Sequence, residues 1–152
     1  MSSFRGQFSH ALDKKGRVSI PARYREILRS QSDEQLILSP RDGHLKAYPL
    51  MEWERMEENL KRFPKFNKTI EDYKRMVFSS AQESSLDAQG RILIPPELRE
   101  KARLKQQVLF VGMIENFEIW NRDIFLKNYA ATSENIRDIE EKVAEIAEKL
   151  GI

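Results

Sequence analysis

The stretch that decides the fold is Leu12-Asp13-Lys14-Lys15-Gly16-Arg17-Val18-Ser19-Ile20-Pro21, continuing as Ala22-Arg23-Tyr24-Arg25-Glu26. It returns as Leu86-Asp87-Ala88-Gln89-Gly90-Arg91-Ile92-Leu93-Ile94-Pro95, followed by Pro96-Glu97-Leu98-Arg99-Glu100. The copies are 74 residues apart throughout, and eight of the fifteen positions are identical. Because internal repetition at a fixed spacing determines the architecture, we expect two copies of one structural unit.

Each copy is predicted to form a strand, a tight turn, a second short strand and a short helix. Asp13 followed by Gly16 is typical of a type I turn, in which the Asp side chain accepts hydrogen bonds from the backbone two residues on. Residues 17–20 alternate between polar and apolar, which predicts a strand with one buried face. Pro21 and Pro95 suit the first position of a helix, where the missing N–H costs nothing.

The hairpin itself explains the Asp, Gly, Ile and Pro of the motif. The arginines Arg17 and Arg91 differ, because an exposed strand start does not require an arginine. They are therefore the candidates for a functional role.

The hydrophobic pattern extends these units into further elements. In the first half it predicts strands at 4–12, 36–38 and 45–48, a helix at 21–30, a polar loop at 31–34 and a turn at 42–43. A helix opening at Pro49 places Leu50, Trp53, Met56 and Leu60 on one face, and a helix at 67–78 turns Ile70, Tyr73 and Val77 inward. The second half repeats the pattern at an offset of 72, with two residues lost in the loop at 103–107 and Phe125 standing where Trp53 stands.

The tail from Ser133 is predicted to form a separate amphipathic helix, with Ser133 as N-cap and Gly151 at its end. Its apolar residues follow heptad spacing: Ile136, Ile139, Val143, Ile146 and Leu150. Two heptads are too short for a stable coiled coil alone. We expect packing on the helix's own domain, and contact with a neighbouring subunit is the alternative.

Composition limits the classes of protein. The 152 residues are 40% hydrophobic and 33% charged and include no cysteine, which excludes a disulfide framework and a thiolate metal site. No apolar run is long enough for a membrane span, and the first residues lack a signal-peptide core, so a cytoplasmic location is expected. Residues 1–30 carry a net charge of +5 and residues 133–152 a net charge of −3. This asymmetry favours one face for a polyanion, although a mixed solvated surface is an equally simple explanation.

A single copy has too few elements to bury a core. Two copies are expected to pair their strands in a shared barrel-like core with both turns at one end. The predicted division is 4–52 for the first repeat, 53–80 for connecting helices, 81–129 for the second repeat and 133–152 for the C-terminal helix.

The doubled Asp-x-x-Gly-Arg motif, Phe4-Arg5-Gly6 and Ala47-Tyr48-Pro49-Leu50-x-x-Trp53 resemble the MraZ family of bacterial transcriptional regulators, within the broader SpoVT/AbrB group. The resemblance runs from residue 4 to about residue 129. It implies an α+β fold with an AbrB-like swapped-hairpin β-barrel, in which two repeats of one chain replace the two chains of an AbrB dimer. It also implies a cytoplasmic, nucleoid-associated protein in homo-oligomeric rings. Such a protein binds double-stranded DNA at direct G-rich repeats upstream of the division and cell-wall gene cluster, including its own promoter, and needs no cofactor.

Arg17 is the first candidate for reading a base, because a guanidinium binds guanine O6 and N7 bidentately in the major groove. Lys15 is expected at a base or a phosphate, and Lys14 and Arg5 at phosphates. Arg91 is expected to be secondary, because Ala88 and Gln89 replace the two lysines in the second copy. We expect Arg25 and Arg99, each followed by a glutamate, to form structural ion pairs.

Two other classes of function are alternatives. An enzyme is disfavoured, because His10 and His44 lie far apart with no ligand or nucleophile spacing, and the chain has no phosphate loop, dinucleotide turn or serine elbow. A non-DNA oligomeric scaffold using the same barrel stays open. The feature that separates it is the grouping of Lys14, Lys15 and Arg17 on one turn, for which a scaffold has no use.

Overall fold

The structure is a computed structural model that describes residues 3–31 and 34–152. The first half contains β1 (Gln7–Ala11), β2 (Arg17–Ser19), α1 (Ala22–Ser30), β3 (Gln35–Arg41), β4 (His44–Pro49) and α2 (Leu50–Leu60). A short α3 (Lys68–Tyr73) and a π-helical turn η1 (Lys74–Phe78) then lead to β5 (Gln82–Ser85), β6 (Arg91–Leu93), α4 (Pro96–Lys101), β7 (Gln107–Gly112), β8 (Phe117–Asn121), α5 (Arg122–Ser133) and α6 (Ile136–Leu150). The order strand, strand, helix, strand, strand, helix thus occurs twice. Ser32 and Asp33, in the expected polar loop, lie outside the described residues.

The strands form two antiparallel sheets, and each sheet contains strands from both repeats. A six-stranded sheet has the order β1-β7-β8-β4-β3-β5, and β2 pairs with β6 in a separate ribbon. β1 of the first half therefore pairs with β7 of the second, and β5 of the second pairs with β3 of the first. The fold is α+β as expected, but in the described residues no ladder closes the strands into the expected barrel.

The core lies between the sheets and the two short helices α1 and α4. The α1 side chains Tyr24 and Leu28 are fully buried, as is Leu98 of α4. The Tyr24 hydroxyl donates to the Gly6 carbonyl oxygen over 2.9 Å, and its ring lies with its centroid 4.9 Å from that of Phe117. Both halves of the chain therefore share one hydrophobic core, which is what a single copy could not supply.

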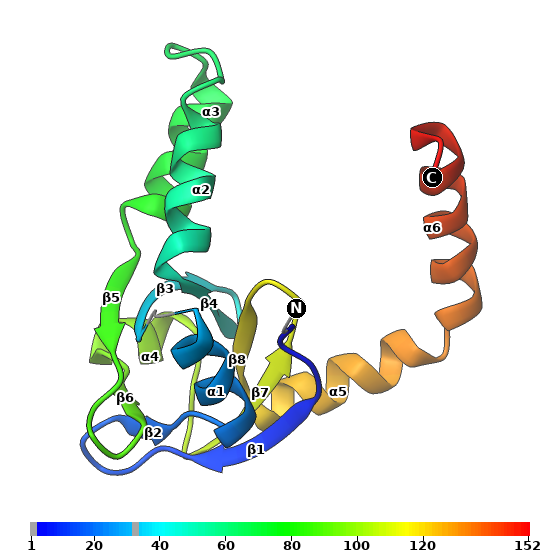
Figure 1. Cartoon of the computed structure of the whole chain (residues 1–152). Coiled ribbons are helices and arrows are strands. Elements are labelled where there is room, and N and C mark those ends of the chain that lie inside the picture. The colour runs from blue at the N-terminus through cyan, green and yellow to red at the C-terminus, as the bar shows by residue number, and fades with distance from the viewer. Residues whose placement is uncertain (1–2, 32–33) are drawn as a thin grey trace.

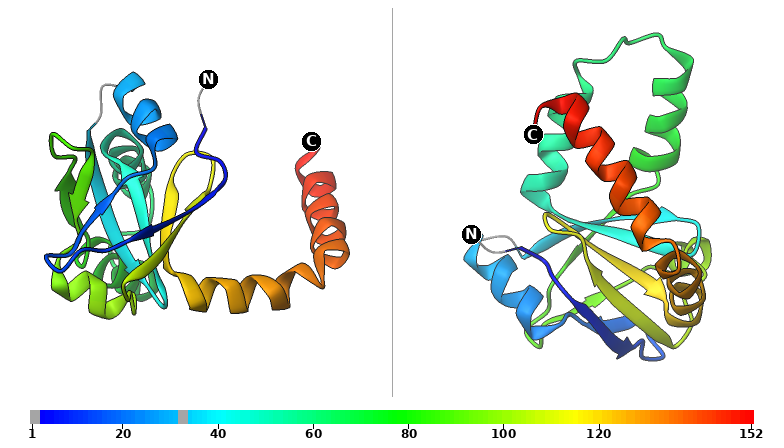
Figure 2. Two further views of the ribbon diagram at one scale, coloured as in Figure 1. Left: turned by 90° about the horizontal axis from the view of Figure 1, so that it is seen from below. Right: turned by 90° about the vertical axis from the view of Figure 1, so that its right-hand side faces the viewer.

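Two helical elements project from this body. α2 and the α3–η1 segment form a hairpin on one flank, and α5 leads away to α6 on the other (Figures 1 and 2). Trp53 and Val77 anchor the hairpin to the sheet, where they join Tyr48 and Ile37 in a second apolar cluster. Phe125 of α5 is buried on β7 and β8 as predicted from its match to Trp53. Among the described residues, none of the helices has the length and apolar character needed to span a bilayer.

Three local expectations were wrong. Pro21 and Pro95 are the N-cap residues of their helices, and Pro96 takes the first helical position of α4. Tyr73 is 42% exposed with its ring centroid 5.7 Å from that of Phe78, and of the three residues expected to face inward only Val77 is buried. Ser133 is the last residue of α5 and donates its hydroxyl to the Ala130 carbonyl, so Asn135 stands at the start of α6 instead.

Candidate nucleic-acid interface

The two copies of the motif meet in the β2–β6 ribbon, at the end of the molecule opposite the helical hairpin (Figure 1). Val18 pairs with Ile92, and both side chains are buried beneath the ribbon. Because directly opposite residues share a face, the neighbouring pairs Arg17–Leu93 and Ser19–Arg91 lie on the outer face. Arg17 and Arg91 are diagonal neighbours, which places their Cα atoms about 7–8 Å apart.

Backbone hydrogen bonds tie each turn to the opposite copy. The Ile20 N–H donates to the Gly90 carbonyl over 3.0 Å, and the Ile94 N–H donates to the Gly16 carbonyl over 2.9 Å. Each strand therefore continues its ladder onto the other copy's turn. The spacing between the two arginines is fixed by the ribbon as a whole.

The first turn is closed by Asp13. The Gly16 N–H donates to the Asp13 carbonyl over 3.0 Å, and Gly16 has φ +85°, a left-handed conformation that favours glycine. The Asp13 carboxylate accepts the backbone N–H groups of Lys15 and Arg17, each over 2.9 Å. These contacts confirm the predicted Asp turn.

Asp13 also orients the Arg17 guanidinium, because Arg17 Nε donates to Asp13 Oδ2 over 2.7 Å. The backbone N–H of Arg17, with its side chain and the Lys15 N–H, lowers the pKa of Asp13 to about 2. The carboxylate thus stays charged at neutral pH. Within the described part of the chain, both Nη atoms of Arg17 are left without a hydrogen-bond partner, and these atoms can form a bidentate contact.

The second turn has the same backbone hydrogen bonds, but its arginine has an additional side-chain partner. Asp87 accepts the N–H groups of Gln89 and Arg91 and binds Arg91 Nε over 2.9 Å. The backbone N–H of Arg91 and its side chain lower the pKa of Asp87 as well. Arg91 Nη2, however, donates to the Gln89 side-chain oxygen. One edge of the guanidinium is therefore already occupied.

Arg25 and Arg99 do not form the expected ion pairs with carboxylates of the described residues. Each lies across the turn glycine of the opposite copy instead. A Cβ at Gly16 would stand 2.7 Å from Cζ of Arg99, and one at Gly90 would stand 2.5 Å from Cδ of Arg25. Their recurrence at matched positions was a sequence signal for a symmetric packing role.

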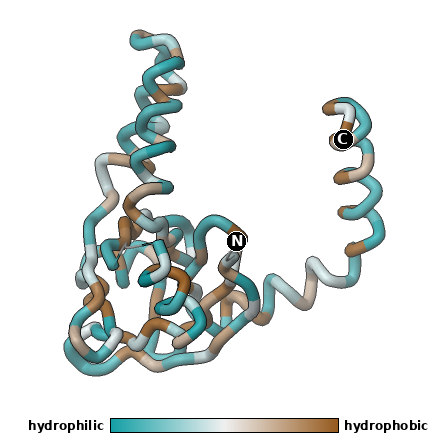
Figure 3. Tube along the Cα trace, in the orientation of Figure 1, coloured by the Kyte–Doolittle hydropathy of each residue, from teal (hydrophilic) through white to brown (hydrophobic). Residues whose placement is uncertain are grey.

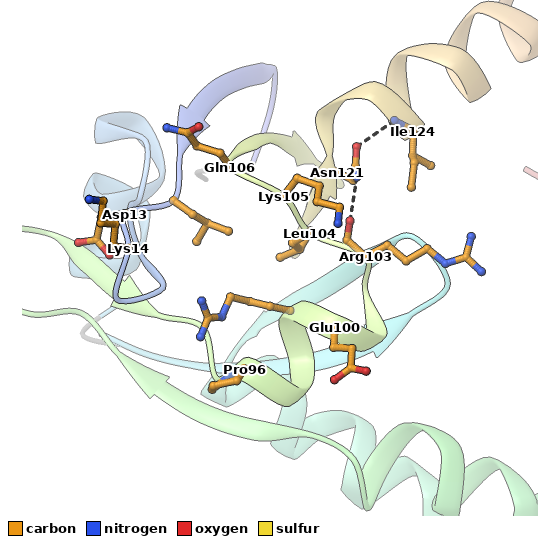
Figure 4. A pocket seen from close by; sticks show the side chains of 12 residues that line it. Asp13, Lys14, Pro96, Glu100, Arg103, Leu104, Lys105, Gln106, Asn121 and Ile124 are labelled. Atoms are coloured by element: carbon orange, nitrogen blue, oxygen red, sulfur yellow. Dashed lines mark hydrogen bonds between the residues drawn. The ribbon is translucent and has the colours of Figure 1, made fainter.

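Lys14 and Lys15 are exposed on the first turn, as a phosphate contact requires. Lys14 also lines a depression of about 930 Å³ whose other cationic residues are Arg99, Arg103 and Lys105. Figure 4 shows Asp13 and Lys14 facing Arg103 and Lys105 across it. Of the three, Arg103 is paired with Asp42 at 3.2 Å. This grouping could not be seen in the sequence, because it is the pairing of β1 with β7 that brings together residues about 90 positions apart.

Arg5 does not join this group. It precedes β1 beside the isolated bridge of Phe4 with Ile114, whereas the turn follows β1. The five residues of β1 alone separate the two by about 16 Å at a strand rise of 3.3 Å per residue. Arg5 is exposed, but it lies at the other end of the strand.

A separate buried group lies on the outer side of the β4–β8 pair. Glu118 accepts from Trp120 Nε1 over 2.8 Å and lies 3.0 Å from Lys46 Nζ. His44 stacks on Trp120, and burial lowers the pKa of this histidine. His10 lies in β1, which is separated from β4 by the two strands β7 and β8, so the two histidines do not form one site.

Comparison with known proteins places the chain in one family. The model of the family described as "MraZ protein, putative antitoxin-like" matches it twice, over residues 3–76 and 77–145. Each match contains one copy of the repeated motif. The second extends past residue 129 and into α6.

Similar proteins of other bacteria are named "Transcriptional regulator MraZ". The protein of Syntrophobacter fumaroxidans is 45% identical over 78% of this chain and 79% of its own length. That of Pelotomaculum thermopropionicum is 39% identical over 98% of this chain and 99% of its own. That of Clostridium acetobutylicum is 38% identical over 94% and 98%.

Proposed function

This chain belongs to the MraZ family, and from that membership we propose that it is a sequence-specific DNA-binding transcriptional regulator that reads DNA with the β2–β6 ribbon. The observation that carries the proposal is a two-stranded ribbon with an arginine on its outer face at each diagonal corner. The major groove of B-DNA admits a two-stranded ribbon, and arginine to guanine is the commonest specific contact there.

The first turn does most of the reading. Arg17 is held by Asp13 at Nε only, so its Nη atoms bind a guanine edge bidentately. Lys15 contacts an adjacent base or phosphate, and Lys14, with Lys105 across the depression, contacts phosphates that fix the register. Arg91 contributes less, because Gln89 already occupies one edge of its guanidinium.

Arg5 is assigned to a phosphate outside the ribbon's own footprint. It is exposed but lies beyond the far end of β1. If it contacts the same duplex, it does so on a neighbouring stretch of backbone. Its removal should weaken binding to every sequence alike.

The proposed targets are direct G-rich repeats upstream of the division and cell-wall gene cluster, including the protein's own promoter. The proposed location is the cytoplasm, in association with the nucleoid. One subunit with one or two reading arginines binds weakly. A homo-oligomeric ring that presents several ribbons to evenly spaced repeats raises the effective concentration of each.

The exchange of strands between the repeats supports an AbrB-like swapped-hairpin arrangement as the origin of this fold. β1, β2 and β5 each pair with a strand of the other half of the chain. In that arrangement residues 4–52 and 81–129 are the two units, residues 53–80 connect them, and residues 133–152 are an appended helix.

Fluorescence anisotropy tests the function. Wild type, Arg17→Ala and the control Lys127→Ala, which removes an exposed cation of α5, are titrated onto a duplex from upstream of the protein's own gene. A scrambled duplex and a salt series accompany each titration. We expect Arg17→Ala to lose the preference for the native duplex, while Lys127→Ala keeps it.

The salt series separates base contacts from phosphate contacts. For Z phosphate contacts the slope of log K against log salt is about −0.9Z. Arg17→Ala is expected to keep that slope. If the wild type shows neither sequence preference nor salt dependence, the ribbon is structural and the protein is an oligomeric scaffold.

A further inference from the structure

The five heptad residues of α6 face solvent in the single chain. Ile136, Ile139, Val143, Ile146 and Leu150 are between 37% and 67% exposed, and Ala147 is the one α6 residue that is half-buried. The helix does not pack on its own domain, which was the expectation from the sequence. Figure 3 shows these apolar positions recurring along an otherwise hydrophilic helix. We call these five residues the α6 seam.

We propose that the α6 seam of one chain docks on the helical hairpin of a second copy of the same chain, in the groove between α2 and η1. An isolated helix of 15 residues is marginal in water. An amphipathic face of this size is stabilised by burial against another surface. The helical hairpin supplies such a surface, because it has a partly apolar groove and a net charge opposite to that of α6.

The groove is lined by two half-buried apolar side chains, Leu60 and Phe78. The exposed residues Glu57, Lys61, Lys74 and Ser79 complete its lining. Beyond it, the hairpin exposes further large apolar side chains, among them Phe66 at 94% and Met76 at 72%. An amphipathic helix that lays its apolar face into a hydrophobic groove is a common mode of peptide recognition.

Charge selects the hairpin over a second α6 as the occupant. Residues 133–152 carry a net charge of −3, whereas the whole hairpin, residues 50–78, carries a net charge of +1, with its cations gathered in residues 61–76, which carry +4. Two α6 helices would bring together like net charges. An α6 helix and a hairpin bring together opposite charges around complementary apolar surfaces.

The placement of the two surfaces dictates the kind of assembly. The hairpin and α6 rise from opposite flanks of the body, and α5 acts as a strut that holds α6 away (Figure 1). A contact between different surfaces of two copies is heterologous, and such contacts close into rings or continue as filaments. The inference thus rests on the proposed self-association and specifies its interface, and it is independent of DNA binding.

Three variants of the full chain, studied without DNA, test the interface by sedimentation velocity. The seam variant is Ile139→Glu with Ile146→Glu, and the groove variant is Leu60→Glu with Lys74→Glu. The control variant, Arg137→Gln with Ala144→Glu, changes the net charge of α6 by the same −2 away from the seam. We expect wild type and control to form assemblies larger than a dimer, and the seam and groove variants to sediment as monomers.

Mixing the two monomeric variants gives the decisive result. The seam variant keeps an intact groove and the groove variant an intact α6, so one interface forms and cannot propagate. We expect the equimolar mixture to form a 1:1 dimer and nothing larger. Recovery of a dimer also proves that both variants are folded, and thermal unfolding of each confirms it separately.

Other outcomes overturn the inference in distinguishable ways. If the groove variant assembles like wild type, α6 packs on some other surface and self-association stands. If the mixture stays monomeric although both variants unfold at the wild-type temperature, the two surfaces are not partners. If wild type itself is monomeric, the proposed self-association fails along with this interface.

Discussion

The two turns of the β2–β6 ribbon share a backbone but differ in what they offer to solvent. In both, an aspartate accepts two N–H groups and the arginine Nε, and a left-handed glycine closes the turn. The first turn adds Lys14 and Lys15 and leaves the Arg17 Nη atoms available. The second has Ala88 and Gln89, and Gln89 occupies Arg91. The comparison separates residues that build the turn from residues that act through it.

The turns are nevertheless not independent in structure. Each accepts a hydrogen bond from the opposite strand end, and each glycine is covered by an arginine of the opposite helix, Arg99 over Gly16 and Arg25 over Gly90. A substitution that distorts the backbone of one turn will therefore also destabilise the other turn. Substitutions of the solvent-facing side chains will not destabilise the opposite turn.

The largest expected difference concerns the two reading arginines. Arg17→Ala should lower the discrimination between native and scrambled duplex by about 1–3 kcal/mol, the value of one bidentate contact. Arg91→Ala should cost less, because Gln89 competes for the same guanidinium edge. Competition binding of both variants at one salt concentration measures this. Equal losses would mean that the two turns read DNA equally and that Gln89 moves aside on binding.

Replacing the turn glycines should affect stability, and here the second turn should show the larger effect. Alanine in a left-handed conformation costs about 1–2 kcal/mol, so both Gly16→Ala and Gly90→Ala should lower the free energy of unfolding. Gly90→Ala should lower it more, because the new Cβ would meet not only Nη1 of Arg25 but also Cδ, nearer the backbone, at 2.5 Å, whereas at Gly16 it meets only guanidinium atoms of Arg99.

Urea unfolding at one protein concentration gives these values. Gly43→Ala is the control, because Gly43 also has a positive φ (+82°) but its nearest foreign side-chain atom, in Ile124, would be 3.3 Å from a Cβ. If the free energy of unfolding falls by the same amount in all three variants, Arg25 and Arg99 move aside at no cost and do not stabilise the turns.

A smaller effect should follow from giving the second turn the lysines of the first. Ala88→Lys with Gln89→Lys frees Arg91 and adds two cations, so the log–log salt slope should steepen by up to about 1.8 if both reach phosphates. The reverse exchange, Lys14→Ala with Lys15→Gln, should make the slope shallower by a similar amount. An unchanged slope in the first variant would show that the second turn does not approach the duplex.

The smallest effect concerns pH. The pKa of Asp13 is lowered to about 2, so its contribution to stability is complete above its ordinary pKa near 3.8 and is lost as pH falls through about 2. Asp87, whose pKa is also lowered, behaves in the same direction. Turn stability should therefore be constant between pH 5 and 8. Carboxyl NMR titration, with Asp13→Asn as reference, checks this, and an Asp13 midpoint near 4 would contradict it.

The local structure of the repeats could be predicted from the sequence, because it is encoded within a few residues. The Asp turn, the alternating strand with Val18 buried, and the burial of Phe125 in the place of Trp53 all follow from spacing. Side-chain roles that depend on local hydrogen bonds, such as that of Asp13, follow as well.

Contacts between the halves could not be predicted in the same way. Alternation shows which face of β2 is buried but not that its partner is β6, and nothing near Lys14 points to Lys105. The ion pairs expected for Arg25 and Arg99 were wrong because a neighbouring glutamate is a local cue, whereas their packing partners are distant glycines. For α6, heptad spacing identified the apolar face but not what covers it.

Site-specific crosslinking tests the central claim most directly, because the chain has no native cysteine. Ser19→Cys places one photoactivatable crosslinker on the outer face of the ribbon, between Arg17 and Arg91, and Glu141→Cys places one on α6. The ribbon account predicts crosslinks from Ser19→Cys to the native duplex, suppressed by unlabelled native duplex and not by scrambled duplex, and only background from Glu141→Cys. Crosslinking from α6 with none from the ribbon would contradict it.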